Sequence, residues 1–203
     1  MEVPDRAAAS SPADASEILY AYKPSLMGAP FELRLTPDAL EWRRGTTTGR
    51  APYGRIRRVR LGFRPMTMQN YRFLTEVWTA DGPKLQIAST SWKSLVEHER
   101  FDAAYRAFVT ELCRRLGAAN GETLFQTGSF PVIYWLGLLV FLGAALSFAA
   151  LIVRALQVEA WSGASFIAAF LAFFLWQAGA FFHRNRPGIF SPNAVPEAVL
   201  PKR

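Results

Sequence analysis

The chain has 203 residues, a formal net charge of +7 and a hydrophobic content of 51%. A uniform soluble domain rarely combines these properties, and here they are segregated: residues 1–129 hold 18 of the 23 lysines and arginines, whereas residues 130–203 are largely apolar. The single cysteine, Cys113, excludes an intramolecular disulfide and gives no support for an oxidising compartment.

Residues 1–17 are rich in alanine, serine, proline and aspartate. They contain no apolar segment of the kind that a signal peptide requires. This composition predicts a disordered N-terminal tail.

Residues 31–90 alternate between apolar and polar side chains, as β-strands with one buried face do. The segments TPD at 36–38, GTTTG at 45–49 and DGP at 81–83 are typical of turns. We therefore expect about six short antiparallel strands in this part of the chain.

A helix is predicted after the strands, because five apolar side chains share one helical face. These residues are Phe101, Tyr105, Phe108, Leu112 and Leu116. Gly117 is placed to end the helix, and Trp92, Leu95 and Val96 fit an earlier turn of it. The expected fold class of residues 18–118 is α+β, a small β-barrel or sheet closed by a C-terminal amphipathic helix.

The segment FELRLTPDALEWRRG, followed by APYGRIRRVRLGF, resembles the opening of bacterial pleckstrin-homology-like (PH-like) domains. The resemblance covers residues 18–118 and includes the pattern Ile56, Val59 and Leu61 on one strand. The architecture of such a domain beside transmembrane helices is similar to that of uncharacterised bacterial membrane proteins. Phosphoinositide-binding members of the wider family hold phosphates with basic residues near the first strand loops. Here the turn at 36–38 has an acid and no base, and the bacterial group implies no particular ligand.

Two stretches without a charged side chain, residues 132–153 and 160–182, predict a transmembrane hairpin. At ~1.5 Å per residue each spans about 33 Å, enough for a hydrocarbon core of roughly 30 Å. Residues 119–131 are expected to form a juxtamembrane linker. Small residues four apart predict the face through which the two helices pack. They are Gly143 and Ser147 on the first helix and Ala164, Ala168 and Ala172 on the second.

The connection between the two spans carries only Arg154, whereas Arg184 and Arg186 follow the second span and Arg114 and Arg115 precede the first. The positive-inside rule then places both termini in the cytoplasm, in a multi-pass protein of the bacterial inner membrane. The tail of residues 183–203 contains four prolines, so it is either solvated and disordered, lies along the membrane, or docks onto the PH-like domain.

Eight arginines, without a lysine or a carboxylate, occur between Arg43 and Arg64. Strand alternation places Arg58 and Arg60 on one side, away from the core, while Arg43, Arg44 and Arg50 flank the predicted turn at 45–49. These five are the candidate contact residues. They form a solvated face, a surface for anionic lipid headgroups, or a surface for an acidic protein or peptide. No nucleic-acid-binding motif accompanies them, so no nucleic-acid partner is expected.

No catalytic motif, phosphate-binding glycine loop or metal-ligand spacing is present, so we expect no enzyme activity, cofactor or metal site. His98 and His183, the two histidines, are isolated along the chain. The sequence favours a membrane-anchored, non-enzymatic binding or scaffolding protein whose basic domain contacts anionic headgroups. The alternative is a subunit of a larger membrane assembly, with other membrane proteins or further copies of this chain, in which the domain binds an acidic partner.

Overall fold

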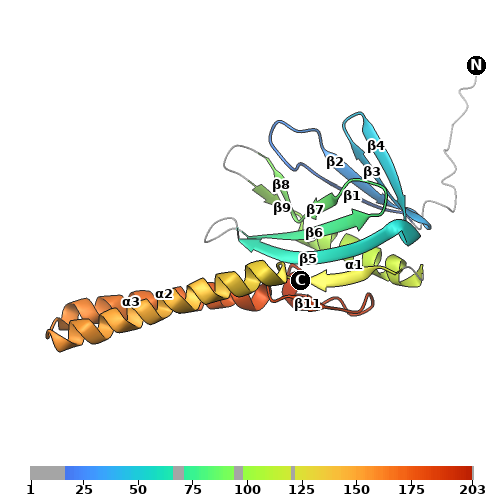
Figure 1. Ribbon diagram of the computed structural model, residues 1–203. Helices are drawn as coiled ribbons and strands as arrows, with labels where there is room; N and C mark the ends of the chain where they lie inside the picture. The colour runs from blue at the N-terminus through green and yellow to red at the C-terminus, as the bar shows by residue number, and fades with distance from the viewer. Residues whose placement is uncertain (1–16, 66–70, 94–97, 120–121, 203) are drawn as a thin grey trace, which may run out of the picture.

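The computed structural model describes residues 17–65, 71–93, 98–119 and 122–202. The predicted tail of residues 1–17 therefore lies almost wholly outside the described residues. Figure 1 shows a domain of strands and one helix, from which two long helices project together to one side.

The first sheet is an antiparallel meander of four strands in chain order. They are β1 (Ile18–Tyr22), β2 (Phe31–Leu35), β3 (Ala39–Arg44) and β4 (Thr47–Pro52). The β3–β4 turn is only two residues long because Gly45 adopts a φ of +61°, so Thr47–Gly49, predicted as part of a turn, belongs to β4.

The second sheet has five strands in the order β11-β10-β5-β6-β7. A short 3₁₀ turn, η2 (Tyr53–Arg55), leads into its antiparallel centre, β5 (Ile56–Pro65), β6 (Tyr71–Thr79) and β7 (Leu85–Ala88). A separate two-stranded hairpin, β8 (Thr90–Trp92) and β9 (His98–Arg100), follows. The expectation of an α+β fold is confirmed, but the described strands form three sheets and no closed barrel.

Helix α1 (Asp102–Ala118) carries the predicted apolar face, and Tyr105, Phe108, Leu112 and Leu116 are buried in one core with both sheets. Gly117 does not end this helix, since the helix continues to Ala118. Trp92 belongs to β8 rather than to an earlier helical turn, and Leu95 and Val96 lie outside the described residues.

The segment expected to be a linker, residues 119–131, contains β10 (Leu124–Thr127), which pairs in parallel with β5. Gly128 follows at a φ of +74°, and its amide donates to the carbonyl of Leu61 at 2.7 Å. A Cβ atom at this position would collide with the backbone of Asn185 and Arg186, so the close approach of these segments requires glycine.

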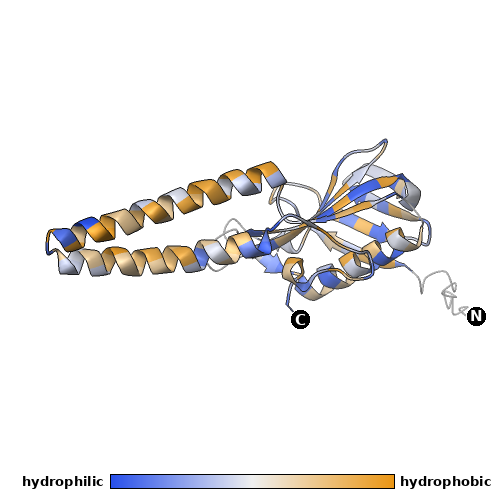
Figure 2. Cartoon of the chain, turned by 60° about the horizontal axis from the view of Figure 1, so that its bottom comes forward, coloured by the Kyte–Doolittle hydropathy of each residue, from blue (hydrophilic) through white to orange (hydrophobic). Residues whose placement is uncertain are grey.

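Helices α2 (Pro131–Gln157) and α3 (Trp161–Arg184) contain the two predicted spans. Both are long and apolar enough to cross a membrane, and the most apolar window of each has no residue buried inside the protein. Figure 2 shows this apolar character along both helices, with hydrophilic residues at their tip and base.

The packing of α2 against α3 differs from the prediction. Pairs of aromatic rings meet between the helices, including Phe141 with Phe174 at 5.1 Å and Phe148 with Phe170 at 5.4 Å. Of the five small residues, only Ala164 is buried, and the others are exposed: Gly143, Ser147, Ala168 and Ala172. Bulky rings fill the contact because they bury more area than methyl groups do.

The C-terminal tail docks onto the domain, one of the three alternatives that the sequence left open. After α3 it forms β11 (Gly188–Ile189), which pairs with β10, and a 3₁₀ turn, η3 (Glu197–Val199). Phe190, Val199 and Leu200 join the domain core. Arg106 on α1 donates to the carbonyl of Pro201 at 2.8 Å and pairs with Glu197. The domain therefore contains segments from both sides of the helical hairpin.

Candidate functional site

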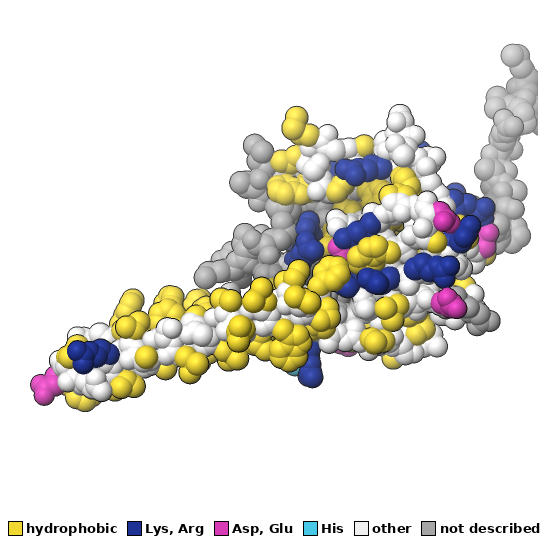
Figure 3. Space-filling model, in the orientation of Figure 1, with side chains coloured by type: hydrophobic (Ala, Val, Ile, Leu, Met, Phe, Trp, Pro, Cys, Tyr) yellow, Lys and Arg dark blue, Asp and Glu magenta, His cyan; other side chains and the backbone are white. Residues whose placement is uncertain are grey.

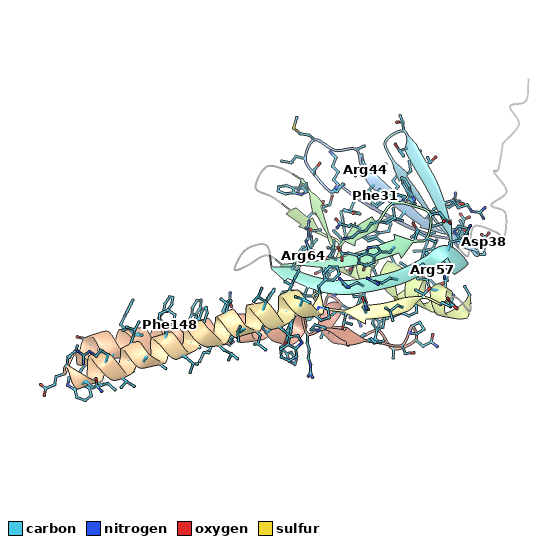
Figure 4. The ribbon with its side chains drawn as sticks, in the orientation of Figure 1. Phe31, Asp38, Arg44, Arg57, Arg64 and Phe148 are labelled. Carbon is cyan, nitrogen blue, oxygen red and sulfur yellow. The ribbon has the colours of Figure 1, made fainter. Side chains whose placement is uncertain are left out.

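The domain has one end beside the base of α2 and α3 and another end away from it. The axis of strand β5 is roughly parallel to the long axis of the helical hairpin (Figure 1). Arg64, near the end of β5, lies beside the helix base, whereas Arg57, near its start, and Asp38 lie at the far end (Figure 4). We call these the junction end and the distal end.

Two of the predicted contact residues, Arg43 and Arg50, lie on the outer face of the first sheet and are paired with acids. Arg43 donates to Glu32 at 2.6 Å. Arg50 lies 2.5 Å from a carboxylate oxygen of Asp38 and 3.4 Å from one of Glu41. Cation and carboxylate alternate across this face, so it presents little uncompensated charge.

The same pairing occurs for other arginines of the first sheet and the distal end. Arg34 pairs with Glu17, Arg55 with Asp81 at 3.2 Å, and Arg57 with Glu122 at 3.4 Å. The pKa of Asp38 is lowered, first by the hydrogen bond from the Thr36 hydroxyl and then by Arg50. An open groove of about 810 Å³ over the first sheet is lined by both signs of charge.

Arg44 does not share a face with Arg43, because successive side chains of a strand point to opposite sides. It stands opposite Phe31 in the β2–β3 register, in the upper part of the domain as drawn in Figure 4. It is exposed, and no ion pair among the described residues includes it.

Arg58 and Arg60 share one face of the second sheet, as predicted, but this face is not simply solvated. Arg58 and Arg60 lie 5.6 and 5.3 Å from the ring centre of Trp78. Arg60 is only 6% exposed, because the ring of Phe130 covers its guanidinium at 3.6 Å. Arg60 is therefore not solvated as strand alternation suggested, since β10 and the start of α2 pack beside it, and its role as a contact residue stays a prediction.

The β5–β6 face continues toward the helices as a cationic row, formed by Arg58, Arg60, Arg64 and Arg72. Figure 3 shows basic side chains along this face, with hydrophobic groups between them. Its one acid in the β5–β6 register is Glu76, opposite Arg60, and Glu76 is held by Lys84 at 2.5 Å.

Arg64 and Arg72 stand directly opposite each other on β5 and β6. Like charges at opposed positions destabilise a strand pair unless an anion compensates them. Burial, and then the charge of Arg64, lowers the pKa of Arg72, whose Nε has no hydrogen-bond partner among the described residues. Neither residue forms an ion pair with another side chain that the structure describes.

Two further arginines, at the end of α3 and just after it, lie at the junction end. Arg184 lies over the ring of Phe63 at 4.9 Å. The neighbouring Asn185 accepts a hydrogen bond from the Phe63 amide at 3.3 Å, which fixes the end of α3 against β5. Arg186 follows and is exposed. Arg64, Arg72, Arg184 and Arg186 are hereafter the junction arginines.

These four residues are not among the contact residues predicted from the sequence. Arg184 and Arg186 entered only the topology argument, and Arg72 was not singled out. Alternation along YRFLTEVWTA places Arg72 opposite Phe73, on the polar side of its strand, but its register with Arg64 depends on the length of the β5–β6 connection.

Within the parts of the chain that the structure describes, no group of three or more His, Cys, Asp and Glu side chains could hold a metal ion. His183 is exposed at the end of α3, and the side chain of His98 is not described. Cys113 is fully buried, and burial raises the pKa of its thiol to about 12. Comparison with family models, curated proteins and solved structures finds no match to this chain.

Proposed function

We propose that this chain is a non-enzymatic bacterial inner-membrane protein in which α2 and α3 cross the bilayer and a basic PH-like domain contacts anionic lipid headgroups at the cytoplasmic face. One observation carries the proposal. The junction arginines lie at the end of the domain where the apolar helices begin, and none of them has a carboxylate partner among the ion pairs between described side chains.

The magnitude of this attraction is adequate to orient the domain. A basic side chain near an anionic surface contributes roughly 1 kcal/mol, so four junction arginines contribute about 4 kcal/mol before screening. Arg58 is six residues from Arg64, or about 20 Å along the strand, which exceeds the Debye length of ~8 Å at physiological salt. The contact surface we propose therefore differs from the one the sequence suggested.

The PH-like assignment is supported by the order of the elements. A four-stranded meander, a three-stranded meander and one helix follow each other in residues 18–118, the range of the sequence resemblance. Strands β10 and β11 and the docked tail extend that unit beyond the range of the resemblance. Their contribution ties the domain to both ends of the hairpin.

The cytoplasmic orientation is supported by the charge at the two ends of the hairpin. The tip carries Arg154 and Glu159, which offset each other, whereas the base carries the junction arginines. Retention of positive charge on the cytoplasmic side favours this orientation. A cysteine at Glu159 is then accessible to an impermeant thiol reagent only from the periplasm.

The test of headgroup contact uses the full chain, because residues 124–127 and 188–200 complete the domain core. Met27→Cys places a dye in the fully exposed β1–β2 connection, while the buried Cys113 thiol stays unreactive. The protein is reconstituted into vesicles with nitroxide-labelled headgroups, neutral or anionic, at about 50 and 300 mM salt. We expect stronger quenching in anionic vesicles that weakens with salt. Equal quenching in both lipids at both salt concentrations contradicts the proposal.

A second candidate, a subunit of a larger membrane assembly, is favoured by one observation. Gly143 and Ser147 are exposed on α2, and nothing lies within 4 Å of a Cβ atom built at Gly143. Small residues allow close approach of another helix. In native membranes, Gly143→Cys would then form disulfide-linked dimers or crosslink to a partner. Phe141→Cys, which faces α3, serves as the control.

A further inference from the structure

A cleft of about 170 Å³ lies where the β5–β6 face meets the first turn of α2. Arg60, Arg64 and Leu74 line one side, and Ser129, Phe130 and Ile133 line the other. At ~30 Å³ per water molecule, the space holds five or six waters, about the size of a small phosphate ester. We call it the junction cleft.

Arg60 gives the junction cleft an unsatisfied cation. Its Nη2 donates to Gln126 Oε1 at 2.8 Å, whereas its Nη1 is buried and has no hydrogen-bond partner among the described residues. A buried donor left unpaired on a charged group is costly. The ring that covers the guanidinium belongs to Phe130, which also lines the cleft and is itself 45% exposed.

The start of α2 provides a second, independent attraction for an anion. No side-chain hydrogen bond caps this helix, and its first residue, Pro131, has no amide proton. The first-turn amides of Val132 and Ile133 therefore lack a side-chain acceptor. They lie at the N-terminus of a 27-residue helix, which is the positive end of the helix dipole. Helix N-termini of this kind bind phosphate groups.

The net charge around the cleft is positive and favours an anion, even when the single acidic residue in the cleft lining is counted. Glu76 also lines the cleft, and its Oε1 accepts from Lys84 at 2.5 Å and from Gln86 at 3.3 Å. Arg60, Arg64 and Lys84 outnumber Glu76 by two positive charges. Arg64 is exposed and forms no ion pair within the described parts of the chain.

The other part of the cleft wall is apolar and continues onto the outside of α2. Ile133 is 65% exposed and Leu136, one turn further, is 60% exposed. A ligand that joins a phosphate to hydrocarbon chains fits both parts, whereas inorganic phosphate satisfies only one. We propose that the junction cleft binds the headgroup phosphate of a single membrane phospholipid, whose acyl chains lie along α2. This inference rests on the proposed function, because it requires α2 to cross the bilayer.

The test measures thermal unfolding of the full-length, delipidated protein in detergent by tryptophan fluorescence. The probes are dioleoyl phosphatidylglycerol, dioleoylglycerol (the same chains without phosphate) and inorganic phosphate, each at about 100 µM. The phospholipid should raise Tm by about 5 °C, because a ligand that binds only the folded state stabilises it. The other two probes should shift Tm by less than about 1 °C.

Three variants locate the effect. Arg60→Gln and Arg64→Gln should each lose most of the phospholipid shift, and Arg64→Gln, an exposed position, decides the matter if Arg60→Gln fails to fold. Arg58→Gln is the matched control, since Arg58 lies on the same strand face and over the same Trp78 ring but outside the cleft.

Several outcomes overturn the inference. Equal shifts with dioleoylglycerol indicate apolar packing alone, and equal shifts with inorganic phosphate indicate a free-anion site. A phospholipid shift that survives in Arg64→Gln, or no shift in the wild-type chain, excludes binding in the cleft. The vesicle quenching experiment does not depend on this cleft, because Arg72, Arg184 and Arg186 lie outside its lining. Quenching that persists while the Tm shift is absent rejects the cleft and retains the proposed function.

Discussion

The two outer faces of the domain use arginine in opposite ways. On the first sheet, Arg43 and Arg50 each contact a carboxylate, at 2.6 and 2.5 Å. On the second sheet, Arg58 and Arg60 contact aromatic rings, and Arg64 stands opposite another arginine. The eight arginines of residues 43–64 lie within one short segment of the sequence, yet they do not form one surface.

This difference shows what decides whether a basic residue can serve as a contact. The charge of an exposed arginine is largely neutralised when a carboxylate contacts it, so it attracts a further anion only weakly. The ion pair itself contributes only about 0.2–1 kcal/mol to the stability of the fold. Arg64 and Arg72 keep their charges uncompensated by any described carboxylate, and their mutual repulsion is relieved when an anion approaches. The distance of an arginine from the base of α2 and α3 then decides whether it lies at the junction end or at the distal end.

The largest expected effect concerns the support of the second sheet. Phe190 is buried against Phe125, with ring centres 5.5 Å apart, so Phe190→Ala should destabilise the protein by about 3 kcal/mol. Its neighbour Ile189 is 77% exposed, and Ile189→Ala should change stability by less than about 0.5 kcal/mol. Thermal unfolding of the full chain in detergent measures both. Equal stabilities of the two variants would show that the tail is not part of the core.

A smaller effect should separate the two arginine environments directly. Arg60→Ala removes the hydrogen bond to Gln126 and the contact with Phe130, and should cost about 1–2 kcal/mol. Arg43→Ala removes an exposed ion pair and should cost about 0.5 kcal/mol, less at high salt. Unfolding in denaturant at two salt concentrations compares them. The contrast between the faces disappears if both variants lose the same stability.

The smallest effect is the acid dependence of a paired cluster. Hydrogen bonds from Arg114, and then from Arg115, lower the pKa of Glu111 to about 2 from a usual value near 4.5. Because the folded pKa is lower than the unfolded one, the stabilisation is complete above pH ~4.5 and is lost as pH falls toward ~2. After solvent screening it amounts to about 1 kcal/mol. Glu111→Gln should therefore flatten stability against pH in this window, and an unchanged pH profile would refute the assignment.

Local patterns in the sequence predicted much of the fold. Alternation identified the strands at 31–35 and 56–65, and the spacing of Tyr105, Phe108 and Leu112 identified α1. The apolar lengths of α2 and α3 were equally clear. These features depend on neighbouring residues, so their periodicity is visible without knowledge of the fold.

Long-range pairing could not be predicted in the same way. Strand β10 is four residues long and pairs with β5 in parallel, about 65 residues earlier in the chain. Nothing in LFQT selects that partner. The burial of Arg60 follows from this pairing, because it places Phe130 over the guanidinium. The differences from expectation at Arg60, at residues 119–131 and at Gly143 all concern which surfaces meet in three dimensions.

The most direct test exchanges charge on the two faces within the vesicle quenching assay. Arg64→Glu/Arg72→Glu and Arg43→Glu/Arg50→Glu are introduced separately into the chain labelled at Met27→Cys. Both change the net charge by the same amount. We predict that the first pair abolishes the extra quenching in anionic vesicles and the second leaves at least about two thirds of it, because in the proposed orientation only the junction arginines lie within a Debye length of the bilayer. Equal losses from the two pairs, or a larger loss from Arg43 and Arg50, would contradict the account.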